Sequence, residues 1–166
     1  MNPSATEIHT RPVHRVAKEL VASSGFLLAR LGMGFKSKAI ALLEPEGFEL
    51  WDYSVLALLA EGARETQSTI ADALTVDPSR LVALLDSLER RGLVARQRDP
   101  QDRRRHVVSV TDAGKSELGR LREIIKQLEQ EFLAPLEPAD RKTLHELLLE
   151  LACHNDPRCR FGARKP

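Results

Sequence analysis

The sequence predicts a mainly α-helical fold that carries one small β-hairpin. Apolar residues recur every three or four positions along most of the chain, which is the period of an amphipathic helix. Aromatic residues make up only 4% of the chain and charged residues 30%, a balance typical of a helix-rich protein and not of a β-sandwich. A single stretch, residues 93–110, instead carries β-branched residues on both sides of a turn-forming Asp-Pro-Gln-Asp.

The first third of the chain predicts helices interrupted by a break. From Val13 to Leu31 apolar residues keep a helical period, and residues 35–43 either continue that helix or start a second one. Each glycine in this stretch weakens a continuous helix by up to about 1 kcal/mol. Pro45 and Gly47 then break the chain, and the nearly all-apolar residues 51–60 predict a short helix that is buried on several sides.

Two closely linked helices follow. Residues 66–74 predict a short helix with Thr66 as its N-cap, and the link after it is only two residues long. Asp77 and Pro78 predict the next start, because Asp accepts from a free backbone N–H and Pro at the first position loses no hydrogen bond. This helix should end at Gly92. It should bury a leucine face and expose a polar one, the buried residues being Leu81, Leu84, Leu85 and Leu88 and the exposed ones Ser79, Arg80, Ala83, Asp86, Ser87 and Arg90.

The hairpin that comes next is strongly basic. Two short strands, 93–98 and 106–110, flank the turn at 99–102, and the stretch from Arg90 to Arg105 holds seven arginines and two aspartates. Residues 111–154, which predict a Thr111-capped helix, a bend at two prolines and a final leucine-rich helix, carry a net charge of −3. A basic block on an otherwise neutral or acidic protein indicates a localised polyanion contact, although a solvated arginine-rich loop would give the same pattern.

Helix, short turn, helix and basic hairpin in this order form a winged helix-turn-helix. The second helix, about 14 residues and therefore about 21 Å long, can enter a major groove that is about 12 Å wide. The hairpin places arginines where they can meet phosphates or a narrow minor groove. The alternative is a helical interaction module that binds a protein and not DNA. The position of the arginines favours DNA.

Residues 76–115, VDPSRLVALLDSLERRGLVARQRDPQDRRRHVVSVTDAGK, and the preceding TQSTIADAL resemble the MarR family of transcription regulators. The resemblance implies a cytoplasmic homodimer, built from the first and last helices, that binds a palindromic operator in double-stranded DNA and probes it with one winged domain per subunit. The expected organisation is a flexible lead at 1–11, an N-terminal dimerisation region at 12–48, the winged domain at 49–111, C-terminal dimerisation helices at 112–154 and a flexible tail at 155–166.

The resemblance also implies roles for single residues. Ser79 and Arg80 would lie near bases or phosphates, and Asp102 would brace Arg104 while Arg103 or Arg105 reaches the DNA. Many members carry a Thr-Arg pair where this chain has Val82 and Ala83, which could touch thymine methyl groups instead and which leave the operator sequence open. The complete set of expected DNA-binding residues is Ser79, Arg80, Val82, Ala83, Arg90, Arg98, Arg103, Arg104 and Arg105.

The family implies an effector pocket between its dimerisation helices and its winged domain. The candidates here are Phe26, Arg30, Trp51 and Tyr53, with Arg30 able to hold a carboxylate and the rings able to stack on an aromatic acid. Ordinary core and hinge packing is the alternative. Because Trp51 and Tyr53 are two residues apart, at most one of them should line a pocket. The expected function is that of a repressor relieved by such an effector.

Other classes of function lack support in the sequence. No nucleophile motif accompanies the five histidines, and no Gly-rich phosphate loop, HExxH or CxxC occurs, so we expect neither an enzyme nor a cofactor. Cys153, His154 and Cys159 offer three ligands where a closed zinc site needs four. A metal-sensing or redox-sensing regulator stays open as an alternative. The N-terminus has no signal-peptide-like apolar stretch and no run approaches a membrane span, so we expect a cytoplasmic protein.

Overall fold

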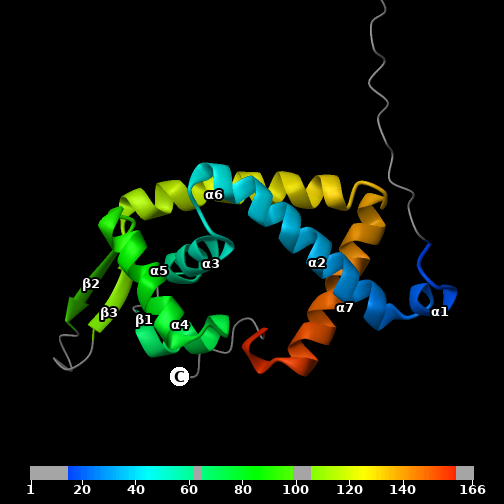
Figure 1. Ribbon diagram of the computed structural model, residues 1–166, viewed down its shortest axis with the longest axis horizontal. Helices are drawn as coiled ribbons and strands as arrows, with labels where there is room; N and C mark the ends of the chain where they lie inside the picture. The colour runs from blue at the N-terminus through cyan, green and yellow to red at the C-terminus, as the bar shows by residue number, and fades with distance from the viewer. Residues whose placement is uncertain (1–14, 62–64, 99–105, 160–166) are drawn as a thin grey trace, which may run out of the picture. The chain divides into compact units, whose positions relative to one another are not determined.

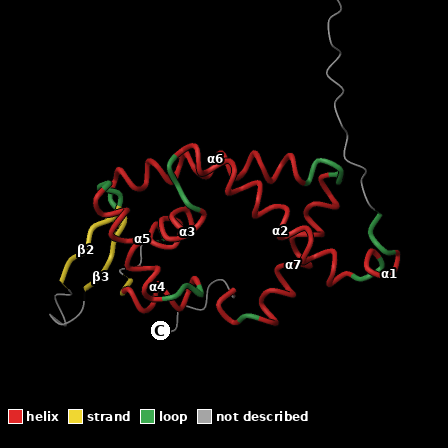
Figure 2. The backbone as a smooth tube through the Cα atoms, in the orientation of Figure 1, coloured by secondary structure: helices red, strands yellow, loops and turns green. Residues whose placement is uncertain are grey.

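The computed structural model describes residues 15–61, 65–98 and 106–159, which form helices and one small antiparallel sheet (Figures 1 and 2). This confirms the expected fold class. The elements are α1 Lys18–Val21, α2 Ser24–Leu43, the 3-10 turn η1 Glu44–Glu46, α3 Leu50–Ala60, β1 Glu65–Thr66, α4 Gln67–Leu74, α5 Pro78–Arg90, β2 Val94–Arg98, β3 His106–Val110, α6 Asp112–Phe132, α7 Pro138–Asn155 and η2 Pro157–Cys159. None of the helices described is long and apolar enough to cross a membrane.

The chain divides into two compact units, residues 1–36 and 37–166. In the first unit the expectation of a helix from Val13 is wrong for residues 15–17, which are not helical, and α1 begins only at Lys18. A break follows at Ala22 and Ser23, because the Ser23 hydroxyl accepts the Phe26 N–H at 3.3 Å and so starts a new helix. From there α2 runs unbroken through all three of its glycines.

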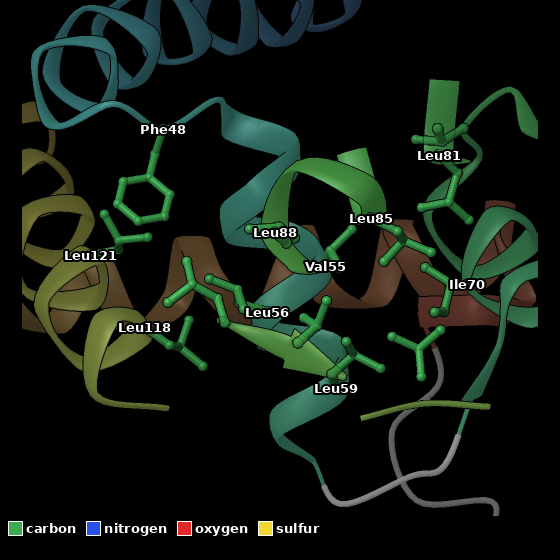
Figure 3. Close-up of a cluster of buried hydrophobic side chains, with 14 of the residues drawn as sticks. Phe48, Val55, Leu56, Leu59, Ile70, Leu81, Leu85, Leu88, Leu118 and Leu121 are labelled. Atoms are coloured by element: carbon green, nitrogen blue, oxygen red, sulfur yellow. The ribbon is translucent and has the colours of Figure 1, made fainter. Parts of the chain in front are cut away.

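The core of the second unit joins side chains from α3, α4, α5, α6 and the segment before α3. Figure 3 shows Phe48 and leucines of α3 and α6 meeting the buried face of α5. The buried residues of α5 are the four that the sequence predicts: Leu81, Leu84, Leu85 and Leu88. The start of this helix is also confirmed, since Asp77 Oδ1 accepts from the N–H groups of Ser79 at 2.9 Å and Arg80 at 3.2 Å.

The hairpin is part of a three-stranded sheet with the order β1-β3-β2. Strands β2 and β3 pair antiparallel from Val94 opposite Val110 to Arg98 opposite His106, close to the limits that the sequence predicts. The third strand, β1, was not predicted. It has only two residues, which is too short to show a period, and it pairs with Val107 and Val108 of β3.

The start of α6 packs directly against Gly92 and Leu93, the two residues just before β2. Thr111 caps α6 by accepting from the Gly114 N–H at 3.0 Å, and its own hydroxyl donates to Gly92 O at 2.7 Å. The approach is so close that a Cβ at Gly114 would lie 2.0 Å from Leu93 O. Only glycine fits this position without moving the backbone.

We therefore predict that Gly114→Ala lowers the free energy of unfolding by about 1–3 kcal/mol through overpacking. Gly119→Ala on the same helix is the matched control, because a Cβ there would have nothing within 4 Å. Alanine is the better helix former, so the control should gain about 0.5–1 kcal/mol. Urea unfolding of both variants checks this. Similar changes in both would show that the close approach at Gly114 is not needed.

Candidate nucleic-acid interface

The exposed face of α5 mixes charged, polar and apolar side chains and includes the acidic Asp86. Ser79, Arg80, Ala83 and Arg90 are exposed, and 42% of Val82 is accessible to solvent. Because the opposite face is buried in the core, the rotation of the helix about its axis is fixed. These residues therefore lie together on one surface, as the sequence predicts, although their contacts with DNA stay a prediction.

Arg80 does not extend freely from this surface. Its Nη2 donates to Glu49 Oε2 at 3.0 Å, and its guanidinium carbon lies 5.9 Å from the centre of the Trp51 ring. Both partners belong to the start of α3, Glu49 being its N-cap. Local sequence patterns do not predict this interaction, because the partners are about thirty residues apart in the chain.

Arg96 is a positioning residue that was not singled out from the sequence. From β2 it reaches α5, where Nη1 lies 2.5 Å from Asp86 Oδ1 and 3.2 Å from Glu89 Oε2. Its side chain is only 19% exposed, and Nε is buried with no hydrogen-bond partner among the described residues. Arg96 lies two residues after the buried Val94 and therefore on the same face of β2. Arg96 thus ties the hairpin to the helix.

The tip of the hairpin lies outside the described residues. This applies to Asp102, Arg103, Arg104 and Arg105, so the expected Asp102–Arg104 ion pair stays a prediction. Arg98, at the end of β2, is exposed and free of the core. The described part of the hairpin therefore directs its last arginine towards solvent.

The segment Glu44–Glu49, which we call the linker, is held by further arginines. Arg91, at the end of α5, donates to Gly47 O at 3.0 Å and stacks 3.9 Å from the centre of the Phe48 ring. From α6, Arg120 forms an ion pair with Glu46.

Just after the linker, Asp52 accepts the Glu49 N–H at 2.8 Å. Burial raises the pKa of its carboxyl, and the hydrogen bond from Glu49 and the charge of Arg91 act in the opposite direction. Its Oδ1 is buried and has no partner among the described residues.

The expected effector residues occur in both units. Phe26, half-buried, and Arg30, exposed, lie on α2 in the first unit. Trp51 and Tyr53 lie on α3 in the second unit, half-buried against its core. Their role in an effector pocket stays a prediction.

The C-terminal cysteines lie close together in the chain. Cys153 Sγ lies 3.1 Å from Cys159 O, and neither cysteine forms a disulfide. Throughout the described ranges, no three His, Cys, Asp or Glu side chains are placed to hold a metal ion. Between the two cysteines in the chain, hydrogen bonds from Arg158 lower the pKa of the Asp156 carboxyl.

Helix, turn, helix and an antiparallel hairpin tied back to the second helix define the winged helix-turn-helix class of DNA-binding proteins. The model of the MarR family matches residues 50–106. A putative transcriptional regulatory protein for the hcr operon of Thauera aromatica is 33% identical over 147 residues, which cover 85% of this chain and 89% of that protein. The chain therefore belongs to the MarR family and is a transcriptional regulator.

Solved structures agree with this assignment. The transcriptional repressor CouR bound to a 23-mer DNA duplex is 30% identical, with a TM-score of 0.74 over 84% of this chain and 99% of that one. CouR from Rhodococcus jostii RHA1 bound to p-coumaroyl-CoA is also 30% identical, with a TM-score of 0.69 over 82% of this chain and 96% of that one. These neighbours are similar to the chain along nearly their whole length.

The position of Arg96 leads to a prediction about stability. Arg96→Met should lower the free energy of unfolding by about 1–3 kcal/mol, because it leaves Asp86 and Glu89 without their partly buried partner. Arg90→Met is the control, since within the described part of the chain the exposed Arg90 donates to the carbonyl of Asp86 on its own helix and to no other group. The control should stay within about 0.5 kcal/mol of the wild type. Equal losses in urea unfolding would mean that Arg96 does not tie the hairpin to α5.

Proposed function

We propose that the protein is a homodimeric repressor that binds a palindromic operator through α5 and the hairpin, and that a small aromatic acid releases it. The observation that carries the DNA-binding part is α5 itself. A buried leucine face fixes it in the fold. The outward face carries small side chains and two cations, with one exposed acid, Asp86, whose charge is paired with Arg96. Such a surface fits a major groove.

The charge distribution supports an interaction with the DNA backbone. The seven arginines between Arg90 and Arg105 belong to the end of α5 and to the hairpin segment, whereas residues 111–154 are acidic overall. Arg91 and Arg96 are engaged with the linker and with α5. The other five arginines of this stretch are the ones that would meet phosphates on either side of the groove that α5 enters. The repressor CouR, similar along its whole length, has been solved on duplex DNA. The rival function, protein binding without DNA, has no comparable observation in its favour.

The terminal helices support a dimer. Helix α7 buries none of its residues, and Leu147, Leu148 and Leu151 are 39–55% exposed. On α2, large apolar side chains are exposed as well: Leu27, Leu28, Leu31, Met33, Ile40 and Leu42. Exposed apolar surface of this kind is uncommon on a monomer and typical of a subunit interface. A second copy of the chain is the partner that we propose for it.

The effector is proposed from chemistry and from similarity. Arg30 offers a charged fork for a carboxylate, and the ring of Phe26 on the same helix offers a stacking surface. CouR has been solved with p-coumaroyl-CoA, a ligand that contains an aromatic ring and anionic groups. An aromatic acid or its thioester is the class of effector that fits both observations.

The DNA-binding proposal predicts a specific salt dependence. Arg103→Ala with Arg105→Ala should weaken binding to any duplex and flatten the plot of log affinity against log salt by about 0.9 for each phosphate that is no longer neutralised. Arg122→Ala with Lys126→Ala, two exposed positions on α6, removes the same charge away from the hairpin and should have less effect. Fluorescence anisotropy over a salt series measures this. If the two pairs behave alike, the hairpin is not a DNA-binding wing.

The dimer proposal predicts the effect of polar residues on α7. Leu147→Gln with Leu151→Gln should weaken the dimer at least about 100-fold, since burying one leucine contributes about 1.5–3 kcal/mol. Lys142→Gln with Glu146→Gln, on the other side of the helix, also leaves the net charge unchanged and should leave assembly intact. Sedimentation velocity at micromolar concentration distinguishes them. A wild-type monomer that still binds its operator would falsify the dimer.

A further inference from the structure

The cation at the start of α5 is already engaged within the protein. Arg80 holds the carboxylate of Glu49 at 3.0 Å and the face of Trp51 at 5.9 Å. The two groups are an anionic oxygen and an aromatic face. Duplex DNA offers the first of these groups, as phosphate oxygens and as carbonyl oxygens on the base edges in its grooves.

This interaction is exposed enough to be exchanged. The side chain of Arg80 is 56% exposed and that of Glu49 is 61% exposed, so water reaches both. An ion pair in such surroundings contributes little to stability and is screened by salt. A ligand with several acceptors, such as DNA, can therefore displace Glu49 without unfolding anything.

We propose that Glu49 and Trp51 form an internal holding site for Arg80, and that DNA must displace Glu49 to engage this arginine. Glu49 then limits the affinity of the protein for DNA although it makes no favourable interaction with DNA itself. The inference rests on the proposed DNA-binding function and adds a residue that regulates it. Glu49 lies on the chain just before α3, outside the helix-turn-helix and the hairpin.

A double-mutant cycle on DNA binding tests the holding site. Glu49→Gln keeps the size of the side chain and an acceptor oxygen but removes the charge. It should tighten binding about 1.5- to 5-fold, the range expected for release of an exposed ion pair. In an Arg80→Met background, Glu49→Gln should change the affinity for DNA no more than the control substitution Glu46→Gln does, because no arginine is left to release.

The control separates competition for Arg80 from a general loss of negative charge. Glu46→Gln removes the same charge three residues earlier, where the partner is Arg120 of α6. Both variants are titrated with a duplex covering the DNA directly upstream of the gene and with a random duplex of equal length, at one salt concentration. If Glu49→Gln tightens binding no more than Glu46→Gln, or equally in both backgrounds, the holding site is refuted.

A second readout follows the holding site without relying on affinity. Trp51 is the single tryptophan of the chain, so its fluorescence reports on the neighbourhood of Arg80 alone. Arg80→Met should change the emission of the free protein, and adding DNA to the wild type should move its emission in the same direction. An unchanged emission in Arg80→Met excludes the interaction in solution. If the wild type binds neither duplex, the proposed function fails, and the holding site fails with it because it has no competitor.

Discussion

Burial of one leucine face orders the DNA-binding half of this protein. Leu81, Leu85 and Leu88 join α5 to the core cluster that side chains of α3, α4 and α6 also form, as Figure 3 shows, and Leu84 on the same face is buried as well. Because successive residues of a helix are about 100° apart, a shift of one position would carry Arg80 or Val82 into the core and a leucine into water. The apolar face therefore decides which side chains a groove can meet, and the interactions at the two ends of α5 only refine its position.

Those end interactions converge on the linker. Arg80, at the first turn of α5, bonds Glu49, whereas Arg91, just past the last turn, bonds Gly47 and stacks on Phe48. Arg120 ties the same segment to α6. A displacement of the linker would therefore change the contacts at both ends of α5 at once. This gives a mechanical reason why the residue that we propose to hold Arg80 belongs to this segment.

Local signals made most of the fold predictable. The Asp77-Pro78 start, the leucine spacing and the Thr111 cap are each contained within a few residues, and the structure reproduces all three. Interactions between residues far apart in the chain could not be predicted from such local signals. The partner of Arg80 lies 31 residues away, and Arg96 looks like another wing arginine until the face of β2 that it occupies is known. The break between α1 and α2 was missed because a period among apolar residues does not reveal a local competitor such as the Ser23 hydroxyl. Phe26, Arg30, Trp51 and Tyr53 were grouped by chemistry alone, and the roles assigned to them stay predictions.

The bare leucines of α7 have a consequence for how the protein would respond to its own abundance. If two such faces must meet before a subunit is complete, the population of paired chains rises with the square of the concentration of single chains at low abundance. Growth and division steadily dilute a protein whose synthesis has stopped, so occupancy of a DNA site would fall more steeply than the protein level does. The apolar face of one helix would in this way convert a gradual decline in protein concentration into a steep, threshold-like loss of DNA occupancy.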